Sequence, residues 1–98
     1  MAERDAPGAR RWRMDGRVQG VGFRYFARQV ARELGLVGWV ANAADGSVVV
    51  EAAGSPEALE RLAGRLAEGP PAARVARLSE EWRGPAPGWT GFEIRNGD

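Results

Sequence analysis

Hydrophobic and polar residues alternate with two different periods along this chain, which predicts both strands and helices. Over residues 10–16, Trp12 and Met14 alternate with charged residues, the period-two pattern of a strand with one buried face. Apolar residues then recur at helical spacing over 23–34, so they form one stripe along a helix. Gly35 follows this stripe and is typical of a helix C-terminus.

A pair of strands joined by a hairpin is expected after this helix. Residues 36–40 and 47–53 are apolar runs, and Asp45 with Gly46 between them is a strong hairpin signal. Three consecutive valines in the second run indicate a strand that is largely buried. The two runs therefore predict neighbouring strands in one sheet.

The remainder of the chain predicts a second helix and two more strands. Ser55 followed by Pro56 is typical of an N-cap with proline at the first helical position. Apolar residues recur at helical spacing over 59–67, and a Gly-Pro-Pro sequence ends the helix. A strand is expected over 74–82, and a short last strand contains the apolar positions of 92–94.

This order of elements predicts a ferredoxin-like βαββαβ sandwich of the α/β (α+β) class, with an added short C-terminal strand. Each helix has one apolar face, so both helices must cover the same face of one mainly antiparallel sheet. Residues 1–9 show no periodicity and are expected to form a flexible tail. Residues 10–98 are expected to form a single domain, since 98 residues leave no room for two.

The pattern also assigns several side chains to the interior or the surface. Trp39 and Trp82 are expected in the core, with Trp82 on the same strand face as its apolar neighbours. Arg28 and Arg32 are expected on a solvated helix face. Trp89 lies in a Pro/Gly loop, where it could cap the loop or border a site, and the sequence does not decide between these roles.

Composition narrows the chemistry that this domain can perform. All fourteen basic residues are Arg, and the chain has no Lys, His or Cys. These absences exclude a thiolate nucleophile, a histidine general base, Schiff-base chemistry and a P-loop lysine. We expect no metal site and no cofactor. An enzyme of this composition would act by positioning and electrostatics.

The charge distribution points to one end of the chain for an anionic ligand. Residues 1–32 carry eight Arg and three acidic residues, whereas residues 33–70 carry two Arg and six acidic residues. The net charge of only +1 argues against a nucleic-acid partner. No apolar run is long enough to span a membrane and no signal peptide is recognisable, so we expect a cytoplasmic protein. We also expect a monomer.

The basic end contains a glycine-rich segment between the first strand and the first helix. Glycines allow successive backbone N–H groups to converge on one point, and the first N–H groups of a helix have no helical partner. Together with the helix dipole they form an anion site, and the planar guanidinium of Arg24 fits phosphate oxygens. Spacing alone leaves open whether these glycines only permit a tight turn and Arg24 is solvated.

Longer motifs carry a resemblance to the acylphosphatase family over roughly residues 10–96. The first motif is Gly16-Arg17-Val18-Gln19-Gly20-Val21-Gly22-Phe23-Arg24, and the second is Gly38-Trp39-Val40-Ala41-Asn42, followed by Asp45-Gly46. The segment Gly91-Phe92-Glu93-Ile94-Arg95 resembles the closing strand of the family. The first motif is long, and its agreement with the second at the expected distance makes chance similarity improbable.

The resemblance implies an enzyme that hydrolyses small acyl phosphates to a carboxylate and phosphate without a metal or cofactor. It implies that Arg24 binds the phosphoryl group and that Asn42 orients the attacking water. The family's phosphate cradle would be lined by the backbone N–H groups of Gln19, Gly20, Val21, Gly22, Phe23 and Arg24. An acyl phosphate has a good leaving group, so positioning and charge stabilisation suffice without a general base.

Two other functions remain as alternatives to the enzyme. One is a non-catalytic phosphate-binding module, because acylphosphatase-like domains also occur in larger carbamoyl-transfer proteins of hydrogenase maturation. The chain lacks the rest of such a protein, so a free-standing enzyme is favoured. The other is an RNA-binding ferredoxin-like domain, which is disfavoured because the strands show no aromatic–basic–aromatic pattern.

Overall fold

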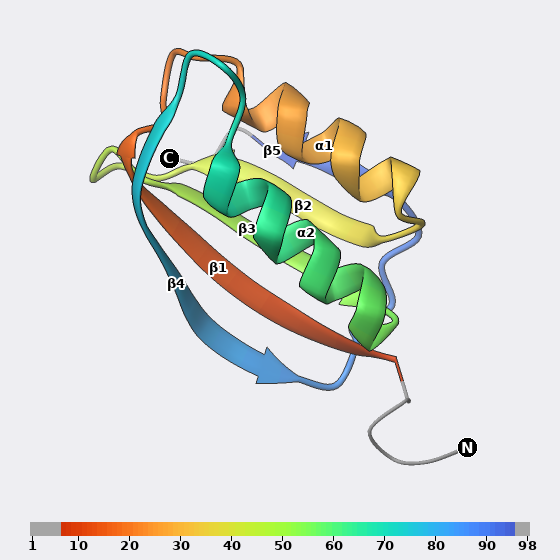
Figure 1. Cartoon of the computed structure of the whole chain (residues 1–98). Coiled ribbons are helices and arrows are strands. Elements are labelled where there is room, and N and C mark those ends of the chain that lie inside the picture. Colours follow the sequence, from red (N-terminus) through yellow and green to blue (C-terminus); the bar gives the residue numbers. More distant parts are fainter. Residues whose placement is uncertain (1–6, 96–98) are drawn as a thin grey trace.

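The computed structural model describes residues 7–95, which form five strands and two helices in the order that the sequence predicts (Figure 1). The elements are β1 (Gly8–Arg17), α1 (Phe23–Glu33), β2 (Val37–Asn42), β3 (Val48–Gly54), α2 (Pro56–Glu68), β4 (Arg74–Gly84) and β5 (Phe92–Arg95). The strands form one sheet in the order β4-β1-β3-β2-β5. Only the β2–β5 pair is parallel within this part of the chain, so the sheet is mainly antiparallel, as expected.

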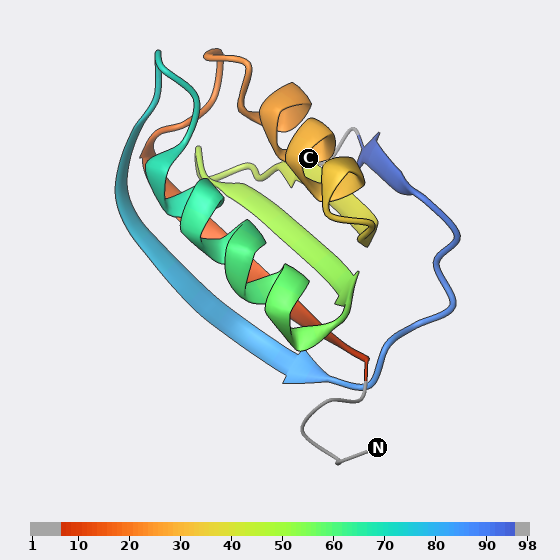
Figure 2. The same ribbon diagram turned by 45° about the vertical axis from the view of Figure 1, so that its right-hand side comes forward.

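Both helices lie on the same face of the sheet, and the core lies between them and the strands (Figure 2). Alternate residues of the strands point into this layer, among them Trp12 and Met14, which are fully buried. The helical stripes face them with Phe23, Val30, Leu62 and other residues of the same kind. Burying each such side chain contributes about 1.5–3 kcal/mol. In the described part of the chain, no helix is long and apolar enough to cross a membrane.

The first strand begins earlier than the sequence suggests. Gly8 and Ala9 pair with Gly54 and Ala53 of β3, so they are part of β1 and do not belong to a tail. Ala9 is almost completely buried. The alternation of large apolar residues does not reach these two small residues, which is why the pattern missed them. Residues 1–6 of the expected tail lie outside the described residues.

A β-bulge changes which face of β4 its tryptophan occupies. Trp12 pairs with Glu80, but the neighbouring Arg11 pairs with Trp82, so the extra residue Glu81 reverses the alternation. Leu78 therefore lies on the helix side, whereas Trp82 lies on the opposite face and is 41% exposed. The expectation that Trp82 is a core residue is wrong, because periodicity in one strand cannot show a bulge.

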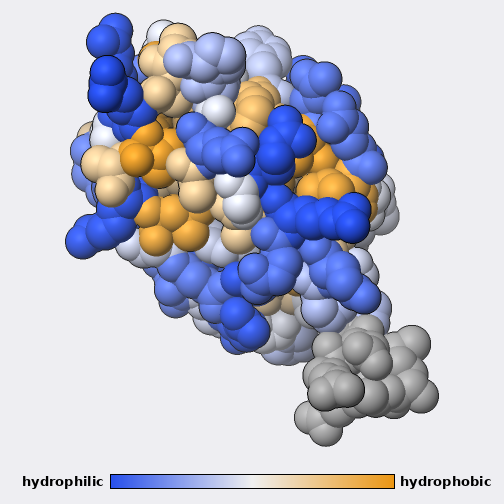
Figure 3. All heavy atoms as spheres, viewed as in Figure 1, coloured by the Kyte–Doolittle hydropathy of each residue, from blue (hydrophilic) through white to orange (hydrophobic). Residues whose placement is uncertain are grey.

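The helix-free face of the sheet carries long charged side chains around an aromatic ring. Arg11 pairs with Glu51 and Glu81, and its guanidinium lies 5.8 Å from the centroid of the Trp39 ring. The guanidinium of Arg95 lies 5.0 Å from the same ring. Trp39 is thus half-buried on this face and does not enter the main core. On the helix side, charged residues cover much of the surface and separate smaller apolar areas (Figure 3).

Gly38 allows β2 and β3 to lie close together, which yields the first testable expectation. Its φ is 144°, and a Cβ added there would lie 1.9 Å from the carbonyl oxygen of Glu51. We expect Gly38→Ala to lower the free energy of unfolding by about 3 kcal/mol or more, because strained backbone and steric overlap both oppose the native pairing. Urea unfolding followed by tryptophan fluorescence measures this change.

Gly64 provides the matched control for this substitution. It is exposed within α2, and a Cβ added there would contact nothing within 4 Å. Gly64→Ala should raise the free energy of unfolding by about 0.5–1 kcal/mol, since alanine restricts the unfolded chain and favours the helix. Equal stabilities of the two variants would contradict the described packing at Gly38.

Candidate active site

The loop between β1 and α1 turns on two glycines with left-handed backbone. Gly20 has a φ of 73° and Gly22 a φ of 78°, and Gly22 is the N-cap of α1. The first hydrogen bond of the helix runs from the N–H of Phe26 to the carbonyl of Gly22. Within residues 7–95, the N–H groups of Gln19 to Arg24 donate to no other protein group. The loop therefore leaves a row of unsatisfied donors at the positive end of the helix dipole.

A small cavity of about 90 Å³ lies beside this loop; Arg24 and Asn42 both line it, whereas Gln19 and Val21 of the expected cradle do not. Its lining residues are Val18, Gly20, Gly22, Phe23, Arg24, Tyr25 and Asn42. The structure thus brings Arg24 and Asn42 together although they are far apart in the sequence.

Arg24 is half-buried at the second position of α1. In the described structure, its guanidinium makes no hydrogen bond and no ion pair with another residue. Arg13 differs, because it binds Glu81, Asp45 and Ser47. The charge of Arg24 is therefore available to an anion in the cavity, beside the free N–H groups of the loop.

Asn42 is the last residue of β2 and precedes a hairpin that has its own hydrogen-bond network. The N–H of Ala43 donates to the carbonyl of Ser47 at 2.8 Å, and the N–H of Gly46 donates to the carbonyl of Ala43 at 3.1 Å. The carboxylate of Asp45 accepts from the N–H and the hydroxyl of Ser47. This local network closes the hairpin and fixes the point at which Asn42 leaves the sheet.

The side chain of Gln19 joins the glycine loop to this hairpin. Its Nε2 donates to the carbonyl of Ala43 at 2.8 Å and to the carbonyl of Ser47 at 2.9 Å. The sequence suggested only the backbone N–H of Gln19 as a site component. Nothing in the local pattern signals the role of the side chain, because its partners lie 24 and 28 residues away.

Charged side chains on the helix-free face of the sheet also hold this hairpin. The Arg13 guanidinium donates to Ser47 Oγ at 2.6 Å, to Asp45 Oδ2 at 3.2 Å and to Glu81 Oε2 at 2.7 Å. The hydroxyl and N–H of Ser47, helped by Arg13, hold the pKa of Asp45 below its ordinary value. Hydrogen bonds from Arg13 and then Arg11 lower the pKa of Glu81.

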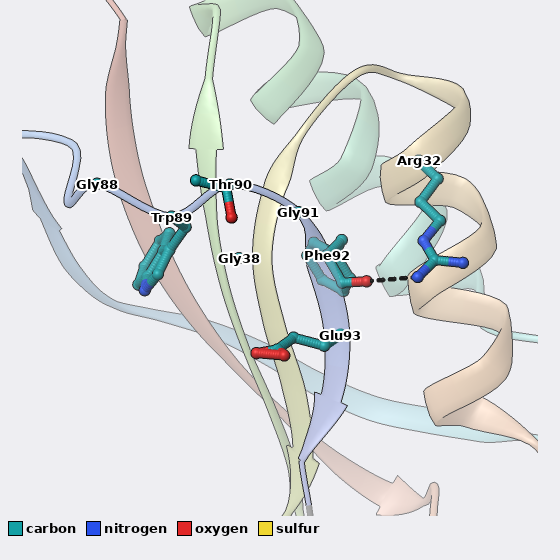
Figure 4. Close-up of a pocket in the computed structure, with 8 residues that line it drawn as sticks. All are labelled: Arg32, Gly38, Gly88, Trp89, Thr90, Gly91, Phe92 and Glu93. Carbon is teal, nitrogen blue, oxygen red and sulfur yellow. Dashed lines mark hydrogen bonds between the residues drawn. The ribbon is translucent and has the colours of Figure 1, made fainter.

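A larger cavity of about 400 Å³ lies near the opposite end of α1, where β5 begins (Figure 4). Trp89 is half-buried in its wall, so it does not border the glycine loop. Arg32 donates from Nη2 to the carbonyl of Phe92 at 3.0 Å. Arg32 is exposed on the helix surface, as expected, and this additional contact arises because the parallel pairing of β5 brings an acceptor to α1. Arg28 lies over the ring of Tyr25, 5.2 Å from its centroid.

Comparison with known proteins shows which family the chain belongs to. The family model described as Acylphosphatase matches residues 10–94, which is most of the chain. The chain belongs to the acylphosphatase family. An acylphosphatase of Salinibacter ruber is 49% identical over 83 residues, covering 85% of this chain and 87% of the relative.

Solved structures agree with this assignment. An acylphosphatase from Coxiella burnetii superposes with a TM-score of 0.87 at 34% identity, covering 95% of this chain and 96% of that one. The structure of T. kodakarensis HypF gives a TM-score of 0.79 at 30% identity, covering 91% of this chain but only 12% of HypF. The sandwich with an added strand is thus the acylphosphatase fold, and the chain is an enzyme that hydrolyses acyl phosphates.

The lowered pKa values around the acylphosphatase hairpin predict a loss of stability in acid. In the folded protein, the carboxyl groups of Asp45 and Glu81 release their protons at a lower pH than ordinary Asp and Glu side chains, whose pKa values are 3.8 and 4.5 respectively. Their stabilisation is complete above those values and is lost as the pH falls through the lowered ones. The urea midpoint should therefore fall between about pH 5 and pH 3 at constant salt.

Arg13→Met supplies the control for this acid effect. Without the guanidinium, the pKa of Glu81 should return toward its ordinary value and that of Asp45, which Ser47 mainly lowers, should rise less, so the fall in midpoint should become smaller. An equally steep fall in the variant would show that other groups dominate the acid sensitivity.

Proposed function

We propose that this acylphosphatase holds the phosphoryl group of its substrate between the glycine loop and Arg24, while Asn42 orients the attacking water. The observation that carries the proposal is the shared cavity, which is lined by the loop glycines, Arg24 and Asn42, in a loop whose N–H groups have no protein acceptor. Anions bind well at such helix N-termini, and the Arg fork can contact two phosphate oxygens at once.

The proposed reaction needs no general base from the protein. Water forms a bond to phosphorus, the bond from phosphorus to the acyl oxygen breaks, and the carboxylate leaves with the electron pair. One proton of the water passes to a phosphate oxygen. Loop N–H groups and Arg24 stabilise the charge on the phosphoryl oxygens, and the Asn42 amide accepts from or donates to the water. Positioning and electrostatic stabilisation supply most of the catalysis in such a step.

We further propose that the reaction is independent of metal ions. The chain has no His or Cys, and within residues 7–95 no group of three carboxylates is arranged to hold a cation. Arg24 and the loop donors would supply the positive potential that a metal ion gives to phosphoryl transfer elsewhere. A monomeric enzyme in the cytoplasm, without a nucleic-acid or membrane partner, stays a prediction. Pairing of Arg11 and Arg13 with carboxylates supports the absence of a nucleic-acid partner.

Substitution of Arg24 tests the phosphate site directly. Arg24→Ala should lower kcat/KM for benzoyl phosphate by at least about 100-fold, the effect of losing one well-aimed donor in an active site. Arg24→Lys should recover little, because an ammonium group cannot replace the planar fork. The assay is run with a chelator, which should leave the wild-type rate unchanged.

Arg28→Ala is the matched control, since it removes the same charge from the same helix one turn later. Its kcat/KM should stay within about threefold of wild type, because surface charges act weakly through solvent. Two variants with the same loss would mean that only the general positive charge matters. A wild-type enzyme silenced by the chelator would contradict metal independence.

A further inference from the structure

We propose that the side-chain amide of Gln19 is a positioning residue for the reaction, because it fixes the glycine loop against the hairpin that bears Asn42. This inference rests on the proposed roles of the loop and of Asn42. Within residues 7–95, the side-chain hydrogen bonds that join the loop to the hairpin are both donated by Gln19. They cross from the proposed phosphate cradle to the residues on either side of the turn after Asn42.

The chemistry of the two contacts defines how the amide is oriented. Both partners are backbone carbonyl oxygens, of Ala43 and Ser47, so only the NH₂ end of the Gln19 amide can face them. Its two N–H groups match the two acceptors, at 2.8 and 2.9 Å. A carboxylate at this position would face the same oxygens with negative charge, and an apolar side chain would donate nothing.

The hairpin does not depend on Gln19 to stay closed. The Ser47 carbonyl keeps the N–H of Ala43 as a second donor, and the Ala43 carbonyl keeps the N–H of Gly46. Loss of the Gln19 amide would therefore free the loop without leaving either carbonyl unpaired. The Gln19 contact therefore contributes little to the stability of the hairpin. Its main effect is to fix the position of the glycine loop relative to the hairpin that bears Asn42.

Ser47 is the point at which three parts of the fold meet. It is 1% exposed, and its hydroxyl accepts from Arg13 on β1 and donates to Asp45 in the hairpin. Its carbonyl accepts from Gln19 in the loop. The hairpin end of the Gln19 contact is thus held by the sheet, so any movement after its loss is expected in the loop.

This arrangement matters because the rate of an in-line phosphoryl transfer depends on the distance between the phosphorus and the attacking water. The proposed cradle places the phosphorus, whereas Asn42 places the water, and the two lie on different segments of the chain. A displacement of about 1 Å between them can lower a rate by about 100-fold. The Gln19 amide spans the gap between these two segments and therefore controls the distance.

A double-mutant cycle with Asn42 distinguishes positioning from a general effect on the fold. Gln19→Met keeps the length and bulk of the side chain but removes both donors. It should lower kcat for benzoyl phosphate by about 10- to 100-fold in the wild-type background. Asn42→Ala alone should also lower kcat. In the Asn42→Ala background, Gln19→Met should lower kcat by less than about threefold, because the water is no longer held.

Two controls accompany the cycle. Gln29→Met makes the same chemical change on the exposed side of α1, where the amide has only a long contact of 3.4 Å to Glu33, and it should leave kcat unchanged. The competitive inhibition constant of inorganic phosphate should change less than kcat in Gln19→Met, which would show that the cradle persists. All variants are assayed well below their thermal midpoints.

Each outcome of the cycle decides a different claim. Equal losses from Gln19→Met in both backgrounds, with Asn42→Ala itself impaired, would overturn the positioning role and leave the proposed function intact. A normal kcat for Gln19→Met would also overturn it. A normal kcat for Asn42→Ala would overturn both the proposed function and this inference.

Discussion

The turn from β1 into α1 is the constraint on which the rest of the site depends. Gly20 and Gly22 adopt left-handed backbone there, so the helix begins without a side-chain cap. Such an end would normally be costly, since its N–H groups lack partners. Here the loop glycines line a small cavity, and in the proposed function the unpaired N–H groups of the helix end bind an anion.

Two kinds of arginine in this chain show how the surroundings determine the use of a charge. Arg11 and Arg13 lie on the helix-free face among Glu51, Glu81 and Asp45, where each guanidinium is matched by carboxylates. Of these pairs, the contacts of Arg13 with Asp45 and Ser47 hold the hairpin. Arg24 lies at the start of α1, where the neighbouring groups are N–H donors, whose hydrogens carry a partial positive charge like that of the guanidinium. An incoming anion can therefore bind there without displacing an internal carboxylate.

Local patterns in the sequence predicted most of the fold. The stripe of α1, the Ser55 cap of α2 and the Asp45-Gly46 turn each depend on a few neighbouring residues, and the structure contains all three. Trp82 was misassigned because a bulge depends on the pairing of two strands and not on one of them. The hydrogen bond of the exposed Arg32 could not be predicted for a similar reason, since its acceptor on Phe92 is distant in the chain.

In the candidate site, too, features that depend on neighbouring residues could be predicted from the sequence, whereas contacts between distant residues could not. Local spacing indicated the glycines beside Arg24 as a candidate anion loop but also allowed a plain turn, and the resemblance added the predicted role of Asn42. The contacts of the Gln19 side chain could not be found, because they depend on how the loop and the hairpin meet in space. The sequence alone thus predicts which groups would bind a phosphate. The distances that let them act together come from the tertiary fold.

A titration of the ¹⁵N-labelled enzyme with inorganic phosphate, followed by backbone amide NMR shifts, tests the central claim most directly. The account predicts saturable shifts that are largest for the amides of residues 19–24, the segment with unsatisfied donors. Shifts concentrated instead around Trp89 and Phe92, in the larger cavity beside α1 and β5, would contradict it.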